Sequence, residues 1–451
     1  MFKNNKILIL GFARSGYEAA KLLVSRENEV ILNDSKEEEN LDLTKVNELK
    51  KLGVKLIFGS HPDDLFDNSF DYLIKNPGVP INHKYVLKAK ELNIEVINEV
   101  EMAYRLMPKD ITLIGITGTN GKTTTTTITY NILKEEYKTR VHLAGNIGYP
   151  LCSILNDLKK DDIVVMEVSC QQLENLSTFN PHIGVITNIT RAHIDFLKTY
   201  EHYKEVKKRL LINQSKNDVA ILNLEDKELI ELTKDLKSTT KYFSSKNEIN
   251  GCYPKDNKIY YYEEDIMSIK DIFIPGKHNL ENILASVMIA KELNVKNETI
   301  KEIVKKFKGV EHRLEYVDTI KGRLFYNDTE ATNIKSTQIA LSSFNQNIIL
   351  FLGGLERGQN FNELKEFMQN VKCIIAIGQS RNRVKDFGNS INIPTFTYET
   401  LQEGFTKAYL ISEESDIILL SPASASWDQY KQCEDRGVEF KKLVEELKNE
   451  N

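Results

Sequence analysis

The sequence of 451 residues has no apolar run close to the ~18 residues that a membrane-spanning helix needs. It also has no long block of charges of one sign, since 60 basic residues stand against 65 acidic ones and the net charge is -5. These absences argue against a membrane protein and against a general nucleic-acid-binding surface. We therefore expect small-molecule substrates, with neither nucleic acid nor membrane as a partner, and a monomer.

Cysteine is scarce, and its five positions show no metal-like spacing. An odd, scattered set is typical of free thiols in a reducing cytoplasm. The early stretch "KILILGFA" is short, is followed by Arg14 and lacks a signal-peptidase site. It predicts a first strand instead of a secretion signal, and the expected location is cytoplasmic.

What the sequence does contain is a repeated alternation of short apolar strands with helical stretches, which predicts α/β domains with parallel sheets. The length suggests about three domains at roughly 150 residues each. We predict an N-terminal Rossmann-like domain over residues 1–106, a central P-loop-type α/β domain over 107–308 and a C-terminal Rossmann-like domain over 309–451. The linker is expected at 104–110, and the Tyr- and Asn-rich segment 240–275 is expected to form hairpins or surface loops.

The stretch "GITGTNGKTTTTTIT" resembles a phosphate-binding loop with unusual glycine spacing. The common pattern places four residues between its first Gly and the Gly-Lys pair. Here five residues separate Gly115 from Gly121, and two separate Gly118 from it. The stretch nevertheless joins an apolar strand to a predicted helix, which is the context of a phosphate cradle. The alternative is a chance Gly-rich turn.

The side chains that follow the glycines suit the same chemistry. Lys122 supplies a point charge for the outer phosphates, and the Thr123 hydroxyl can bind Mg²⁺. The hydroxyls of the later threonines can satisfy N–H groups of the first helical turn or bond back to carbonyls. We assign no chemistry to Thr125–Thr127.

Two further strand ends carry candidate metal ligands. "VVMEVSC" ends a buried strand at Glu167, and "NITRAHIDF" places His193 and Asp195 just after the next strand. Open α/β sheets bind ligands at the carboxyl ends of their strands. A solvated carboxylate and a structural histidine are the plainer alternatives.

Lys207 lies on the apolar face of a predicted helix with Tyr203, Leu210 and Leu211. A bare ammonium there is costly unless it is paired or modified. From periodicity alone, we favour a stem that extends its charge to water.

The N-terminal turn "GFARSG" resembles a dinucleotide-binding fingerprint with Ala13 in place of the middle Gly, and Asp34 follows about twenty residues later. These features keep open a dehydrogenase, which would leave "GTNGKT" unexplained, or simply a tight strand-to-helix turn. A third class is an interaction protein that hydrolyses ATP without joining two substrates by a covalent bond.

Together, "GTNGKT", Glu167, "AHID", Lys207, "GKHNLEN", "EHRLE" and "YNDTEATN" occur in an order that resembles the ATP-dependent Mur ligases of peptidoglycan synthesis. That family has this shifted glycine spacing and a central ATPase domain. The N-terminal "GFARSG" and the C-terminal "LSPASASWDQYKQCEDRGVEF" resemble its D-glutamate-adding branch. Other Mur-type ligases and folylpolyglutamate-type ligases remain alternatives, although the latter lack such an N-terminal domain.

The resemblance implies that ATP phosphorylates the terminal carboxylate of UDP-N-acetylmuramoyl-L-alanine and that the amine of D-glutamate attacks the acyl phosphate. The implied cofactor is Mg²⁺ at two positions. Lys122 and Thr123 would hold ATP and the first ion, and Glu167, His193 and a CO₂-derived carbamate on Lys207 would hold the second. The implied ATP-binding residues are Gly118, Thr119, Asn120, Gly121, Lys122, Thr123, Thr124, Asn279, Asn282, Arg313 and Asp328. Those for the UDP-substrate are Arg14, Ser15, Asp34, Ser35, Lys36, Gly78 and Asn146, and those for D-glutamate are Thr332, Arg357, Ser426 and Trp427.

Two positions depart from the family pattern. Glu330 stands where the family usually has Lys, so it must point away from phosphates or be compensated by another cation. Cys433 stands where the family often has Phe near D-glutamate. Both bear on substrate contacts and leave the implied reaction unchanged.

Overall fold

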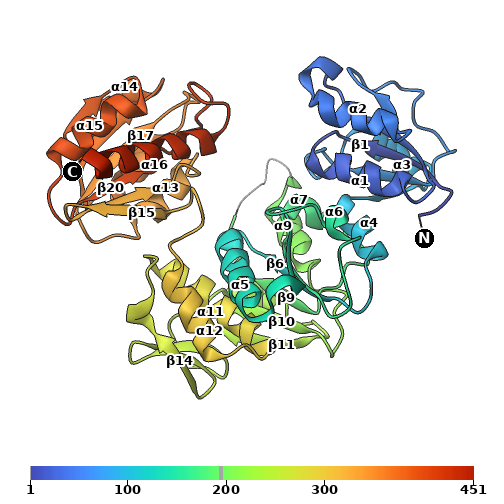
Figure 1. Cartoon of the computed structure of the whole chain (residues 1–451), viewed down its shortest axis with the longest axis horizontal. Coiled ribbons are helices and arrows are strands. Elements are labelled where there is room, and N and C mark those ends of the chain that lie inside the picture. The colour runs from blue at the N-terminus through green and yellow to red at the C-terminus, as the bar shows by residue number, and fades with distance from the viewer. Residues whose placement is uncertain (1, 192–196, 451) are drawn as a thin grey trace. The chain divides into compact units, whose positions relative to one another are not determined.

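A computed structural model describes residues 2–191 and 197–450, and Figure 1 shows three α/β regions along the chain. Backbone contacts divide the chain into two compact units. The first comprises Met1–Lys270 with Glu281–Val304, and the second comprises Asp271–Leu280 with Lys305–Asn451. Among the described residues, no helix combines the length and the apolar character needed to cross a membrane.

The N-terminal region, blue in Figure 1, is a five-stranded parallel sheet in the order β3-β2-β1-β4-β5. Side chains alternate between its faces. Ile7 and Ile9 pack with apolar residues of α1 and α2, whereas Leu8 and Leu10 pack with α3. The elements are β1 (Lys6–Leu10), α1 (Arg14–Val24), β2 (Glu29–Asn33), α2 (Leu43–Lys51), β3 (Lys55–Ile57), β4 (Tyr72–Lys75), α3 (Lys84–Glu91), β5 (Glu95–Ile97) and α4 (Glu99–Leu106).

The central sheet has nine strands in the order β14-β13-β12-β11-β10-β9-β6-β8-β7, and the predicted hairpins form its antiparallel edge. Strand β6 lies between β8 and β9, so the ends of all three meet at one edge of the sheet. The strands are β6 (Thr112–Thr117), β7 (Val141–Gly145), β8 (Ile163–Glu167), β9 (Ile183–Ile186), β10 (Val219–Asn223), β11 (Thr239–Phe243), β12 (Cys252–Lys255), β13 (Lys258–Tyr261) and β14 (Glu264–Ser268).

The helices of this region include the long α5, which packs against β7 and β8. They are α5 (Lys122–Tyr137), α6 (Leu151–Ile154), α7 (Cys170–Leu173), α9 (Tyr200–Lys208), α10 (Lys227–Leu232), α11 (Lys277–Glu292) and α12 (Asn297–Lys306). The expected linker is partly helical, because α4 continues to Leu106. Buried Glu101 on α4 accepts hydrogen bonds from the backbone N–H groups of residues 177–179, which ties that helix to the central region.

The C-terminal region, orange to red in Figure 1, is a six-stranded sheet in the order β15-β16-β20-β17-β18-β19, with β15 antiparallel to β16. Leu350 and Leu352 pack with α13 and α14, whereas Ile349 and Phe351 pack with α15 and α16. The elements are β15 (Glu315–Ile320), β16 (Arg323–Asn327), α13 (Ile334–Leu341), β17 (Ile348–Gly353), β18 (Val371–Ile377), α14 (Arg381–Ser390), β19 (Thr395–Thr397), α15 (Leu401–Ile411), β20 (Ile417–Leu420) and α16 (Cys433–Glu450). The predicted three-domain α/β class is confirmed.

Candidate active site

The loop between β6 and α5 requires both of its glycines. Gly121 has φ +81°, and a Cβ there would lie 2.1 Å from Oδ1 of Asn282. Gly118 has φ +153°, and its Cβ would lie 1.9 Å from Oγ1 of Thr187. Only glycine tolerates such conformations together with such close neighbours. The loop opens onto the N-terminus of α5, where unpaired backbone N–H groups favour an anion.

Side chains from β9 and α9 hold this loop in place. The hydroxyl groups of Thr119 and Tyr203 lie 2.8 Å apart, and the backbone N–H of Asn120 donates to Oδ1 of Asn188 at 2.9 Å. Lys122 Nζ donates to the carbonyl of Thr119 at 2.9 Å. Asn188 was missed from the sequence, because nothing in its local pattern shows that β9 pairs with β6.

Glu167 ends β8 beside the loop and is only 1% exposed. Its Oε1 accepts a hydrogen bond from Nδ2 of Asn146 at 2.7 Å, while its buried Oε2 has no hydrogen-bond partner among the described residues. A buried carboxylate oxygen without a donor is costly in isolation and is a ligand type that Mg²⁺ prefers. This orphan oxygen fits the predicted metal site.

Lys207 points inward, so the expectation that its charge reaches water is wrong. The residue is 1% exposed, and Nζ donates to Oγ1 of Thr117 and to the carbonyl of Gly118, both at 2.9 Å. Burial lowers its pKa to about 7, and the nearby charge of Lys122 adds to the effect. Near neutral pH a substantial fraction of this amine is therefore uncharged, beside the phosphate loop.

The remaining predictions for residues near the phosphate loop have mixed outcomes. His193 and Asp195 lie outside the described residues. Thr123 and Thr124 are partly buried in the first turn of α5. The Thr127 hydroxyl donates back to the carbonyl of Thr123, as expected. The buried hydroxyls of Thr126 and Thr129, however, have no hydrogen-bond partner among the described residues.

A pocket in the first unit brings together three of the predicted UDP-substrate residues, Arg14, Ser15 and Asn146. Arg14 Nη1 donates to the carbonyl of Gly148 at 2.9 Å. Glu99 also lines this pocket and was missed, since it belongs to no motif that the sequence reveals. It accepts a hydrogen bond from the N–H of Cys152, and burial raises its pKa.

The other UDP-substrate candidates do not line this pocket. Asp34 Oδ2 accepts from the N–H of Phe12 at 2.7 Å, and its Oδ1 accepts from the N–H of Lys36 at 2.9 Å. The carboxylate thus joins the turn after β1 to the loop after β2, which also carries Ser35. Gly78 N donates to the Asn76 side chain at 3.4 Å.

Of the four nucleotide candidates beyond the loop, only Asn282 belongs to the first unit, where Oγ1 of Thr125 donates to it at 3.3 Å. Asn279, Arg313 and Asp328 belong to the second unit. Nδ2 of Asn279 donates to the carbonyl of Pro275 at 2.6 Å. Asp328 accepts hydrogen bonds from the N–H of Leu314 and the hydroxyl of Ser421, yet burial raises its pKa to about 7.

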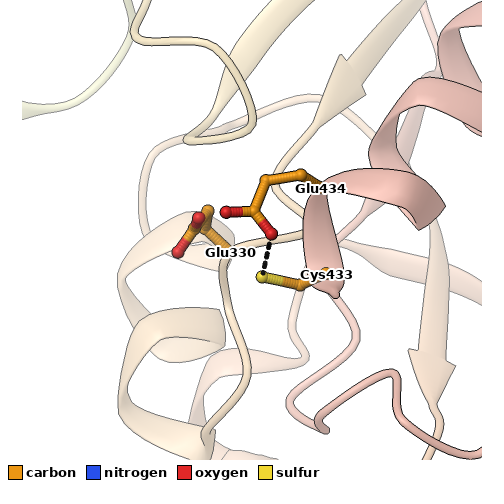
Figure 2. Close-up of side chains that lie close together, drawn as sticks. All are labelled: Glu330, Cys433 and Glu434. Atoms are coloured by element: carbon orange, nitrogen blue, oxygen red, sulfur yellow. Dashed lines mark hydrogen bonds between the residues drawn. The ribbon is translucent and has the colours of Figure 1, made fainter. Parts of the chain in front are cut away.

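The two positions that depart from the family pattern lie close together. Figure 2 shows Glu330, in the loop after β16, close to Cys433 and Glu434 at the start of α16, and the Cys433 thiol donates to Glu434 at 3.3 Å. Glu330 also pairs with Arg313 across 3.4 Å. Arg313 therefore supplies a compensating cation. Burial raises the pKa of the Cys433 thiol to about 12, so it is not a reactive thiolate.

A pocket at the carboxyl edge of the C-terminal sheet contains two of the D-glutamate candidates, Thr332 and Arg357. The guanidinium of Arg357 lies 4.5 Å from the ring centroid of Trp427, which is 60% exposed. Ser426 is buried, and its hydroxyl has no hydrogen-bond partner among the described residues. An unpaired buried hydroxyl and an exposed guanidinium are both donor types that a carboxylate ligand can use.

Comparisons with known proteins agree with this geometry. The domain descriptions that match are "Mur ligase MurD-like, N-terminal domain" over residues 5–98 and "Mur ligase middle domain" over residues 116–290. Among solved structures, a UDP-N-acetylmuramate-alanine ligase from Thermotoga maritima has a TM-score of 0.58 at 19% identity, covering 99% of this chain and 100% of that one. A MurF ligase from the same organism, in complex with ADP, has a TM-score of 0.58 at 18% identity, covering 92% and 95%. These likenesses establish the fold.

Sequence relatives establish the family, and this chain belongs to the Mur ligases. More narrowly, it is 44% identical over 449 residues to the UDP-N-acetylmuramoylalanine–D-glutamate ligase of Enterococcus hirae, covering 99% of this chain and 97% of the relative. It is 42% identical over 448 residues to the enzyme of that name from Bacillus cereus strain G9842, covering 99% and 98%.

Proposed function

We propose that the protein is the ATP-dependent ligase that joins D-glutamate to UDP-N-acetylmuramoyl-L-alanine during peptidoglycan precursor synthesis. The observation that carries this proposal is 44% identity, along nearly the whole chain, to a relative of that name. The glycine loop, the orphan oxygen of Glu167 and the buried amine of Lys207 support it independently. Together these groups would bind the phosphate anions and the metal cation that take part in phosphoryl transfer.

The reaction has two balanced steps. The γ-phosphoryl group of ATP passes to the alanyl carboxylate, which gives ADP and an acyl phosphate. The neutral amine of D-glutamate then attacks the acyl carbon, phosphate leaves and the amine loses a proton. The loop N–H groups and Lys122 hold the transferring phosphates, while the pocket around Arg14 and Asn146 holds the UDP-substrate.

Bound Mg²⁺ would neutralise charge on the phosphoryl group, with Thr123 holding a first ion and Glu167, His193 and Lys207 holding a second. For Lys207 the ligand would be a carbamate. Carbamate formation needs a neutral amine to attack CO₂, and burial provides such an amine near pH 7. Conversion removes a costly cation and creates an oxygen donor.

The domain division at about residues 106 and 308, a cytoplasmic location and a monomeric state complete the proposal. In the second unit, Arg357, Thr332, Ser426 and Trp427 would hold D-glutamate, and Asn279, Arg313 and Asp328 would contact the nucleotide. The pocket around Arg357 and the unpaired Ser426 hydroxyl support the first assignment.

The decisive assay is the dependence of ADP release on substrates. We expect ADP release over many turnovers only when D-glutamate and UDP-N-acetylmuramoyl-L-alanine are both present. Continued ADP release in the absence of one of them would favour a non-ligating ATPase. Release that depends on a different amino acid would indicate another branch of the family.

A further inference from the structure

One fully buried cation remains outside the proposed chemistry. Arg436, in the first turn of α16, is 1% exposed. Its Nε donates to Oγ1 of Thr329 at 2.9 Å, and its Nη2 donates to the carbonyls of Thr329 and Ser424, both at 3.1 Å. All three acceptors are neutral oxygens, and none of the described carboxylates forms an ion pair with this guanidinium.

A buried charge without a paired anion is unfavourable. Burial accordingly lowers the pKa of Arg436 to about 10, although the group stays cationic at neutral pH. An aliphatic side chain of similar length would fill this space without the desolvation cost. The guanidinium has a purpose at this position if its donors, its charge or both serve the neighbouring pocket.

Arg436 hydrogen-bonds to two of the three loops that form this pocket and lies close to the third. Thr329 belongs to the loop after β16, which continues to Thr332, and Ser424 belongs to the loop after β20. On the loop after β17, a Cβ placed on Gly354 would lie 3.1 Å from Nη1 of Arg436. The pocket lining comes from these same loops and includes Thr332, Asn333, Arg357, Gln359, Ala423 and Ala425.

We propose that Arg436 is a positioning residue for the amino-acid pocket: it fixes the three loops relative to one another and directs its uncompensated charge toward a bound carboxylate. The ligand class is therefore an acidic amino acid, and this inference rests on the proposed D-glutamate site. The Thr329 hydroxyl extends the arrangement, because it also donates to the carbonyl of Cys433 at 2.9 Å.

The test measures initial rates of phosphate release by the full-length enzyme, with each of the three substrates varied in turn. Arg436→Met should raise the KM for D-glutamate at least about tenfold, because hydrogen bonds from charged groups are among the stronger ones. The KM values for ATP and the UDP-substrate should stay within about twofold. Arg436→Lys keeps the charge and should recover part of the loss.

Arg323 offers a matched control in the same domain. It lies at the opposite, amino end of β16, where its guanidinium donates to the carbonyl and hydroxyl of Ser412. Arg323→Met should lower the melting temperature without changing the KM for D-glutamate. A similar KM rise in this control, or equal rises for all three substrates in Arg436→Met, would overturn the proposal.

If Arg436→Met does not unfold cooperatively, Arg436→Lys decides the matter, and an unchanged KM for D-glutamate would then refute the positioning role. The wild-type enzyme separates this failure from failure of the proposed function. Wild-type phosphate release that is independent of D-glutamate would refute the function itself, before any variant is compared.

Discussion

The phosphate corner of the first unit consists of the glycine loop, Glu167 and Lys207. It is built differently from the amino-acid pocket of the second unit. In the corner, the groups proposed for chemistry are themselves buried: Glu167 and Lys207 are each 1% exposed, and Lys207 donates a hydrogen bond to the glycine loop. In the pocket, Arg357 and Trp427 lie toward solvent, while the buried cation, Arg436, lies beneath the loops.

The difference matches what each site must do. Phosphoryl transfer develops charge that preorganised, desolvated groups stabilise best. An amino-acid substrate must enter and leave, so its direct contacts can be exposed provided that the loops behind them are fixed. Changes in the corner should therefore abolish turnover, and changes in the pocket should mainly alter the KM for one substrate.

The largest effect should come from Lys207. We expect Lys207→Ala to lose nearly all ligase activity, because the variant lacks the proposed carbamate ligand. Acetate at high concentration should restore part of the rate by occupying the space left beside the metal.

Lys207→Arg keeps a positive charge but cannot form the same carbamate, so it should stay inactive. An active Lys207→Arg enzyme would show that the site requires positive charge instead. Rates of ADP formation, with and without acetate, check these outcomes.

Lys122→Ala should reduce ADP formation about a hundredfold or more, the size of effect seen when one preorganised donor to a transition state is removed. The fold should persist, since Lys122 is only partly buried in the first turn of α5. Melting temperature and ADP formation should be measured together. Nearly normal ADP formation would contradict the phosphate-loop assignment.

The sequence predicted the corner better than the pocket for a physical reason. Gly118, Gly121 and Lys122 form a local motif whose spacing follows directly from backbone geometry. The contacts of Asn188 and Arg436, by contrast, depend on which strands become neighbours, and a local pattern does not contain that information. Periodicity placed Lys207 on the apolar face but could not show that no path to water exists for its ammonium group.

For the pocket, Arg357→Ala should raise the KM for D-glutamate about tenfold or more and leave the KM for ATP nearly unchanged, because a guanidinium pairs well with a carboxylate. Steady-state rates with D-glutamate and ATP varied separately provide the measurement. Equal increases in both constants would remove the distinction between the two regions.

Asp328 tests whether the second unit also tolerates a costly buried group. Its pKa is raised to about 7 by burial, so between about pH 4 and 7 the folded state holds a proton that the unfolded state has lost. Stability contributed by this group therefore falls as pH rises through that window. Asp328→Asn does not titrate, and its stability relative to wild type should increase by about 2 kcal/mol between pH 5 and pH 6.5. Urea unfolding at both pH values measures the difference, and a pH-independent difference would contradict the raised pKa.

The smallest effect is expected at Glu330. If the position faces phosphates, as the usual lysine of the family would, Glu330→Lys should improve the KM for ATP, because a positive charge there is favourable. The structure adds an opposing contribution, since Glu330 pairs with Arg313 at 3.4 Å and a lysine would repel that cation. The pair is partly exposed, so its loss should cost no more than about 1 kcal/mol. We therefore expect a KM for ATP within about threefold of wild type.

Glu330→Gln is the matched control, because it removes the negative charge without adding a positive one. A large loss of activity in Glu330→Lys but not in Glu330→Gln would show that Arg313 must stay free of a second cation to act on the nucleotide. A large loss in both would show that the Arg313 pair itself is required.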